Sequence, residues 1–471
     1  MTTPTQPRPL LRVPLDPGFV PAIRWRRDYQ CAAQADRNAR PFALALLRPD
    51  GTVFIRRERL LAATAANEAR TLRYVERLLK FMLWQKGGNR ILVAGADEVA
   101  RALAAIYAPG GERAFDHEFV GGKIYGAGLT VEAVPMTRLP APCDREVELG
   151  RHLSGCRIGF DLGGSDRKAA AVIDGRVVYS EEVPWSPYFE QDPTYHLEGV
   201  HDSLRRAAAH LPRVDAIGGS AAGVYVNNEV RAGSLFRGVG AEAFDRHIRR
   251  MFFELRDRWG GVPFEVANDG EVTALAGSMA LGKNAVLGVS MGTSQAGGYV
   301  NRAGRVTSWL NELAFVPVDY RPQAPVDEWS GDAGCGVQYF SQQGVARLAA
   351  AAGFEFSPDT ASPERLVAVQ VAMETGDPRA AAVYETLGGY FGYAVAHYAE
   401  FYDLETVLLL GRVTSGPGGE AILGAARDVL HHEFPELAAR LKLCMPDEQS
   451  KRHGQAVAAA SLPSLAVPVS P

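Results

Sequence analysis

The sequence predicts an α/β protein built as two lobes, and three segments carry that prediction. Each of the three begins with an apolar strand that ends in a glycine-rich turn. They are residues 158–181, 285–305 and 406–423. The first two continue as a second strand, and the third continues as a helix. Strands that alternate with helices along one chain are typical of an α/β fold with helices on the faces of its sheets.

The first segment, residues 158–181, holds the most informative turn. An apolar run ends in Asp161, and Gly163, Gly164 and Ser165 follow before the next apolar run. Glycine lets the backbone approach a phosphate closely and leaves amides free to donate to it. An aspartate at the end of the strand can hold Mg²⁺ through water. Taken alone, the segment is either a phosphate-binding turn or an ordinary hairpin.

Further strand–turn signals follow in the chain. In residues 262–282 an apolar strand ends in Asn268 and Asp269, and a helix begins there at once, with the pair placed as its cap. The two later glycine-rich segments have their own turns. Their turn residues are Gly292, Thr293 and Ser294 in the strand–turn–strand segment, and Gly411 and Gly416 in the loop that leads into a helix.

In this order the four segments resemble the superfamily of sugar kinases, heat-shock ATPases and actin. Within it they are most similar to the ROK family of bacterial sugar kinases and sugar-sensing repressors. The resemblance covers roughly residues 157–463. It implies a two-lobed actin-like ATPase (ribonuclease H-like) fold. The phosphate-1 motif would lie in a lobe at 151–284, and the phosphate-2 and adenosine motifs in a lobe at 285–471.

The resemblance also implies a site for ATP with Mg²⁺ and for a small, sugar-like acceptor. Asp161 would hold Mg²⁺ through water, and Asp269 would take the proton from the acceptor hydroxyl. Asn268 and Glu312 would orient the acceptor. Lys168 is similar in spacing to a lysine that reaches the nucleotide phosphates in actin and in BadF-type ATPases. The residues implied at ATP are Gly163, Gly164, Ser165, Lys168, Gly292, Thr293, Ser294, Gly411 and Gly416.

The chain departs from the ROK pattern where those proteins carry a Gly-Glu-x-Gly-His segment and a cysteine-rich zinc loop. Glu312 keeps the glutamate, but Phe315 stands in place of the histidine. Only Cys335 remains of the cysteines, and Val337 stands in place of the loop's glutamate. A structural zinc needs four N or S ligands. We therefore predict a protein without zinc, and an acceptor pocket with two polar contacts fewer.

The composition suits a large enzyme, expected in the cytoplasm. The chain has 471 residues, 47% hydrophobic and 22% charged, enough for two or three domains. The net charge of −4 gives no global basic field, so we expect no nucleic-acid partner. No apolar run approaches the ~20 residues of a membrane span, and the five scattered cysteines suit reduced thiols. The assembly is left open, with a homodimer as one option.

The first 150 residues predict an N-terminal α/β region of unknown role. Its first ~20 residues are expected to form a flexible arm, because they are rich in proline. A hairpin at 42–60, a helix at 67–85, a strand at 90–95 and a helix at 96–107 follow. The region could be a degenerate copy of the next lobe. Two basic clusters are expected to be solvated faces: Arg24, Arg26 and Arg27, and Arg56 and Arg57.

Three functions remain open from the sequence. The first is an ATP-dependent, ROK-like phosphotransferase that acts on the hydroxyl of a sugar or a related metabolite. The second is an actin-like ATPase without a sugar acceptor, and the third is a non-catalytic sugar-sensing regulator. Asn268, Asp269 and Glu312 favour the first function over the second. The intact set of phosphate turns argues against the third.

Overall fold

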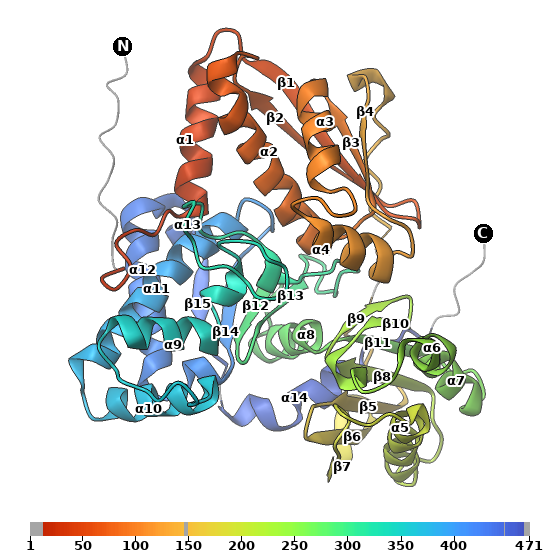
Figure 1. Ribbon diagram of the computed structural model, residues 1–471. Coiled ribbons are helices and arrows are strands. Elements are labelled where there is room, and N and C mark those ends of the chain that lie inside the picture. The colour runs from red at the N-terminus through yellow and green to blue at the C-terminus, as the bar shows by residue number, and fades with distance from the viewer. Residues whose placement is uncertain (1–12, 146–148, 447, 466–471) are drawn as a thin grey trace.

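The computed structural model describes residues 13–145, 149–446 and 448–465, and Figure 1 shows an N-terminal region above two lobes. The N-terminal region contains a four-stranded sheet in the order β2-β1-β3-β4. Its strands are β1 (Arg40–Leu47), β2 (Val53–Leu60), β3 (Arg90–Ala94) and β4 (Thr130–Ala133). Its helices are α1 (Ala22–Ala35), α2 (Ala65–Lys86), α3 (Asp97–Ile106), α4 (Ala114–Asp116), η1 (His117–Ile124) and η2 (Met136–Arg138).

The first lobe has a five-stranded mixed sheet in the order β11-β8-β5-β6-β7 and a small β9–β10 ribbon. The strands are β5 (Cys156–Leu162), β6 (Asp166–Ile173), β7 (Arg176–Pro184), β8 (Ala216–Ala221), β9 (Val224–Val226), β10 (Glu229–Ala232) and β11 (Phe264–Asn268). The helices are α5 (Pro193–Ala208), η3 (Ser234–Phe236), α6 (Ala241–Ala243), η4 (Phe244–Ile248) and α7 (Met251–Arg258).

The second lobe has a four-stranded sheet in the order β13-β12-β14-β15. The strands are β12 (Val286–Met291), β13 (Gln295–Val300), β14 (Thr406–Leu410) and β15 (Lys442–Cys444). Its helices are η5 (Leu313–Phe315), η6 (Gly336–Gln338), α9 (Gln342–Ala351), α10 (Ser362–Glu374), α11 (Pro378–Tyr398), η7 (Arg412–Thr414), α12 (Pro417–Glu433) and α13 (Pro435–Arg440). No helix of the described residues is both long and apolar enough to cross a bilayer.

Two helices lie between the lobes, α8 (Asp269–Leu281) and α14 (Glu448–Ala460). Helix α14 follows the second lobe in sequence but packs on the sheet of the first lobe. Two glycines let it approach. A Cβ at Gly159 of β5 would lie 1.9 Å from the carbonyl oxygen of Ala456, and one at Gly218 of β8 would lie 1.8 Å from that of Ala459. The end of the chain therefore returns to the first lobe, although the sequence analysis placed residues 285–471 in the second.

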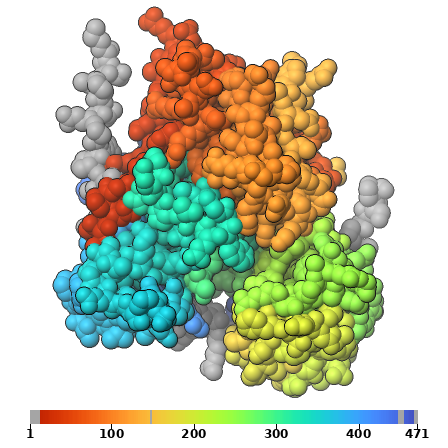
Figure 2. Space-filling model, viewed as in Figure 1, coloured from red at the N-terminus to blue at the C-terminus, as the bar shows by residue number. Residues whose placement is uncertain are grey.

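The hydrophobic cores show which parts of the chain hold together. One continuous core joins the N-terminal region to the second lobe, with Trp84 of α2 and Tyr398 of α11 both fully buried in it. The first lobe has a separate core around Phe160 and Phe252. The N-terminal region also touches the first lobe, through a contact between η1 and β10. Figure 2 shows a recess between the lobes beneath this region.

Three expectations about the N-terminal region are corrected. The basic cluster on α1 is solvated only at Arg27, because Arg26 is buried and Arg24 pairs with Glu433 of the second lobe at 2.8 Å. The expected arm is packed from residue 13 onward, with Phe19 buried, and residues 1–12 lie outside the described chain. The region is not a copy of the first lobe, because β1 has antiparallel neighbours on both sides whereas β5 pairs in parallel with β8.

Candidate functional site

The predicted first phosphate turn joins β5 to β6 in the first lobe. Gly163 closes it, since its amide donates to the carbonyl of Asp166 at 2.9 Å. At Gly164 the turn meets Tyr188, whose hydroxyl would lie 2.0 Å from an added Cβ. Ser165 is exposed, and its hydroxyl donates to Asp166. Space for a side chain is therefore absent at Gly164, which keeps bare backbone at the turn.

Asp161 and Lys168 face each other across the ladder that leads to this turn. Asp161 Oδ1 accepts from Ser220 Oγ at 2.6 Å and from Gln455 Nε2 at 3.1 Å. Its Oδ2 has no hydrogen-bond partner in the described chain. Lys168 Nζ lies 3.3 Å from Asp166 Oδ1 and is about half exposed. An exposed cation therefore stands beside a carboxylate with one free oxygen.

Three carboxyl groups influence one another where the lobes meet. Burial, together with the charge of Asp269, raises the pKa of Asp161 to about 6, against the hydrogen bond from Ser220. Burial and then the charge of Asp269 raise the pKa of Glu312 to about 7. Burial also raises the pKa of Asp269 itself. Asp269 therefore lies within electrostatic range of both Asp161 of the first lobe and Glu312 of the second.

Asn268 and Asp269 have different positions at the start of α8. Asn268 is the helix cap: its Oδ1 accepts from the amide of Gly270 at 2.8 Å, and its Nδ2 donates to the carbonyl of Gly223 at 2.7 Å. Asp269 is the first helical residue, and its Oδ1 accepts from the same amide at 2.9 Å. Its Oδ2 has no partner among the described residues. The cap is therefore present without Asp269, which leaves that carboxylate for another role.

The predicted second phosphate turn joins β12 to β13 in the second lobe. Gly292 closes it with a 2.9 Å bond from its amide to the carbonyl of Ser294, and Thr293 and Ser294 are exposed. Further along β13, a Cβ at Gly298 would lie 2.1 Å from the carbonyl of Gly270. This glycine lets the start of α8, and with it Asp269, lie directly against the second hairpin.

The predicted adenosine loop follows β14. Gly411 has a φ of 98°, and a Cβ there would lie 2.3 Å from the carbonyl of Met291, the residue before the second phosphate turn. Gly416 also has a positive φ, 67°, and precedes α12. Only glycine adopts both conformations without strain. The loop and the second phosphate turn are thus in contact, while Gly416 lies further along the same loop.

Glu312 lies on residues 311–315, which we call the strap. No hydrogen-bond partner for its carboxylate occurs among the described residues. Asn311, beside it, has a φ of 52° and links three elements. Its Nδ2 donates to Glu271 of α8 at 3.2 Å, its Oδ1 accepts from Tyr402 at 3.0 Å, and its amide donates to Gln85 of α2 at 3.0 Å. The strap is therefore fixed from both lobes and from the N-terminal region.

Four polar residues of this site escaped the sequence analysis, namely Ser220, Gln455, Glu271 and Asn311. Ser220 and Gln455 hold Asp161 from elements remote in sequence, and neither belongs to a pattern. Burial and the charge of Glu312 raise the pKa of Glu271 to about 8, although Asn311 donates to it. An acidic residue in the first turn of a helix looks like ordinary dipole complementation. The one feature of the sequence that could have indicated Glu271 as a site residue is its position two residues after Asp269.

Phe315 and Cys335, which stand where ROK proteins carry a histidine and a zinc loop, lie at one small hydrophobic cluster. Phe315 packs on Trp84 and Phe115 of the N-terminal region, with ring centroids 4.3 and 5.4 Å apart. Cys335 is fully buried, 3.5 Å from Asp332 Oδ2. Within the described residues no three His, Cys, Asp or Glu side chains are grouped to hold a metal ion. The absence of zinc in the protein remains a prediction.

The residues present fit ATP and Mg²⁺. The amides of Gly163 and Gly292 close the two turns, whereas the amide of Gly164 has no backbone acceptor among the described residues. Hydroxyl groups and one lysine stand beside the turns. Asp161 keeps a free carboxylate oxygen in surroundings that raise its pKa, and a divalent cation would favour the ionised form there.

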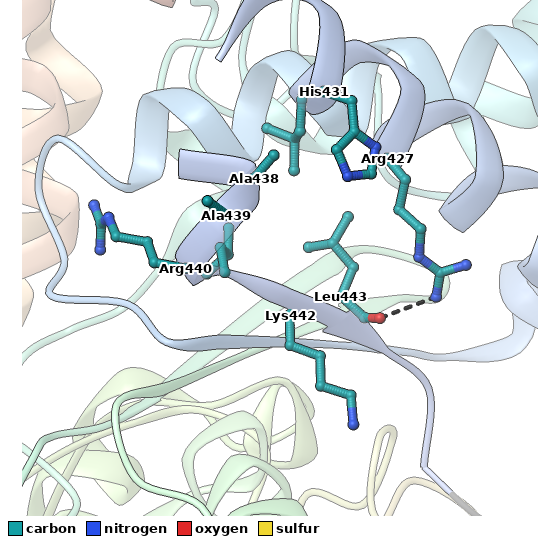
Figure 3. A pocket seen from close by; sticks show the side chains of 9 residues that line it. Arg427, His431, Ala438, Ala439, Arg440, Lys442 and Leu443 are labelled. Carbon is teal, nitrogen blue, oxygen red and sulfur yellow. Dashed lines mark hydrogen bonds between the residues drawn. The ribbon is translucent and has the colours of Figure 1, made fainter. Parts of the chain in front are cut away.

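A separate hollow of about 400 Å³, between α12, α13 and β15, holds none of the predicted site residues. Figure 3 shows it, with His431 pointing in and Arg427 bonded to the carbonyl of Leu443 at its rim.

No protein-family profile matches the chain, and no curated sequence is significantly similar to it. Solved structures do match. A ROK hexokinase from Thermus thermophilus aligns over 64% of this chain and 97% of its own, with 24% identity and a TM-score of 0.50. A glucokinase from Parabacteroides distasonis aligns over 66% and 98%, with 14% identity and a TM-score of 0.50. A ROK family glucokinase from Streptomyces griseus, solved with glucose and AMPPNP, aligns over 65% and 98%, with 21% identity and a TM-score of 0.49.

The matched hexokinase and glucokinase are covered almost end to end, whereas about a third of this chain extends beyond them. Their likeness agrees with the mixed sheets of the two lobes and with the fold that the motif order implies. The chain therefore has the two-lobed, actin-like fold of the ROK sugar kinases, with about a third of its length in addition.

Proposed function

We propose that the protein is an ATP-dependent phosphotransferase that acts on a hydroxyl group of a sugar or a related small metabolite. The observation that carries the proposal is the placement of Asp269. Its carboxylate keeps a free oxygen, is not needed as the helix cap, and lies within electrostatic range of both Asp161 and Glu312. The hexokinase and glucokinase names of the matched structures support a sugar-like acceptor.

Each group has a physical role in this proposal. Phosphoryl transfer depends mainly on positioning and on charge stabilisation. Gly163 and Gly292, whose amides close the two turns, would shape the backbone around the ATP phosphates. The amide of Gly164 and the hydroxyls of Ser165, Thr293 and Ser294 would hold those phosphates, with Lys168 beside them. Bound Mg²⁺, held through water by Asp161, would supply positive charge at those phosphates. Gly411 and Gly416 would border the adenosine.

The acceptor side is carried by carboxylates. Oδ2 of Asp269 would receive the proton of the acceptor hydroxyl, and Glu312 would accept a hydrogen bond from a second hydroxyl. Asn268 has one amide hydrogen left after its bond to Gly223, so it could donate to the acceptor without losing its cap. The raised pKa values of Asp161 and Glu312 predict that turnover falls as the pH drops through about 7 and then 6.

The test compares variants on ATP turnover with and without a sugar panel. Asp269→Ala should lower acceptor-dependent ADP release on the order of 10²- to 10⁴-fold, with nucleotide affinity nearly unchanged. Asp161→Ala should weaken the use of Mg²⁺-ATP instead. The matched control is Asp377→Ala, because Asp377 caps α11 by accepting from the amide of Arg379 at 2.8 Å. That variant should lose about 1 kcal/mol of stability and keep its turnover per folded molecule.

The outcomes separate the three functions. Acceptor-dependent ADP release supports the phosphotransferase, acceptor-independent release supports an ATPase, and no release with intact sugar binding supports a sensor. If Asp269→Ala behaves as Asp377→Ala does, Asp269 is structural and the proposal fails.

A further inference from the structure

The C-terminal end of α2 meets the strap at the edge of the proposed site. A helix leaves its last four carbonyl groups without partners inside the helix. Here the amide of Gly87 donates to Leu83, as expected at a helix end, but the next two carbonyls are reached from elsewhere. The amides of Glu312 and Asn311 donate to the carbonyls of Trp84 and Gln85, both at 3.0 Å. The last helical carbonyl, that of Lys86, accepts from Arg48.

A buried ion cluster lies one turn back on the same helix. It contains three cations and three anions, all at most 6% exposed. Lys80 Nζ lies 2.8 Å from Asp116 and 3.5 Å from Asp332, and Arg113 Nη1 lies 2.8 Å from Asp332. Arg77 Nη1 lies 3.1 Å from the same aspartate. The sixth member is Glu76, which pairs with Arg77 and Arg113.

The strap and the cluster are joined at two points. Trp84 accepts from the Glu312 amide through its backbone and donates through Nε1 to Asp116 of the cluster. On the other side Cys335 Sγ lies 3.5 Å from Asp332 and 3.6 Å from the carbonyl of Phe315, at the end of the strap. A closed ring of contacts therefore runs from Glu312 through Trp84 and the cluster back to Phe315.

We propose that the N-terminal region is a working part of the acceptor site, in which α2 and the buried cluster at Asp332 hold the strap and so position Glu312. The proposal rests on the function proposed above. Trp84, Lys80 and Asp332 are positioning residues, because each acts through the strap and has no free group directed at a substrate. The continuous core between the N-terminal region and the second lobe supports a rigid attachment. Removing one member of an ion pair this deeply buried leaves an uncompensated charge, which strongly destabilises the arrangement around it.

The experiment uses the full chain and two variants. Asp332→Asn removes the charge that three cations share. Trp84→Phe removes the donation to Asp116 and part of the ring packing on Phe315, Phe115 and Phe119. Trp25→Phe is the matched control, since the aromatic partners of Trp25 are Tyr29, Tyr74 and Tyr320, which belong to neither the strap nor the cluster. Hydrogen exchange is followed on peptides spanning residues 307–318, 158–168 and 288–297, with turnover measured on D-glucose, D-mannose and N-acetyl-D-mannosamine.

Both site variants should speed exchange at 307–318 by about tenfold or more and leave the two hairpin peptides unchanged. With an active sugar, its KM should rise about tenfold while the KM for Mg²⁺-ATP stays constant, and kcat should change less. Trp25→Phe should change none of these. If Trp84→Phe matches Trp25→Phe in exchange and in KM, the inference is overturned. If wild type uses no sugar, the proposed function fails, and the exchange result still decides whether α2 holds the strap.

Discussion

Glu271 offers the sharpest test of the electrostatics of the site. It lies 8% exposed in the first turn of α8, and burial together with the charge of Glu312 raises the pKa of its carboxyl from 4.5 to about 8. The folded protein therefore keeps a proton that the unfolded chain releases, so stability is lost as the pH rises from about 4.5 to 8. Above pH 8, ionised Glu271 costs the folded state on the order of 5 kcal/mol.

Glu271→Gln removes that cost, because a neutral amide can still accept from Asn311. The variant should melt at the same temperature as wild type at pH 4.5 and gain steadily above it. Because the entropy of unfolding grows with chain length, a chain of this size shifts by ~1 °C of Tm per kcal/mol. The gain at pH 9 should therefore be roughly 5 °C. Differential scanning calorimetry at pH 4.5, 7 and 9 measures it, with the exposed Glu364→Gln as control. A gain that does not vary with pH, or no gain at pH 9, would refute the assigned burial of this charge.

Further predictions concern the glycines and the missing zinc. Gly164→Ala would place a methyl group 2.0 Å from the Tyr188 hydroxyl, so binding of an ATP analogue, measured by calorimetry, should weaken about tenfold; Gly122→Ala, in open space, is the control and should bind normally. Gly159→Ala would bring its methyl to 1.9 Å from a backbone oxygen of α14, so thermal melting should show a loss of about 1–3 kcal/mol, and unchanged melting would contradict the close approach of that helix. Elemental analysis of dialysed protein should find no zinc, since Cys335 lacks companion ligands, and one zinc per chain would disprove the prediction.

Local patterns predicted the elements that carry the phosphate turns. The apolar runs before Asp161 and Gly292 form strands, and Asn268 caps the helix that follows it, because these features depend on residues a few positions apart. The hairpin and long helix of the N-terminal region follow from the same kind of signal.

Long-range pairing could not be predicted in the same way. Arg77 and Asp332 are 255 positions apart, and no local pattern states that either is buried. The sequence around the three arginines of α1 contains no evident partner for them, so the cluster is typical of a solvated face. The partner of Arg24 is Glu433, which lies 409 positions away in the sequence. A charge on an otherwise apolar helix face, such as Lys80, is the one hint that a buried partner exists.

Helix α14 has a consequence for how the protein is made. It is the last described helix to be synthesised, and chains fold progressively from the N-terminal side as they emerge. Until it emerges, the face of the first-lobe sheet at Gly159 and Gly218 is exposed to solvent, and Asp161 lacks the hydrogen bond from Gln455. The nascent chain therefore cannot complete the proposed phosphate site until α14 has been translated.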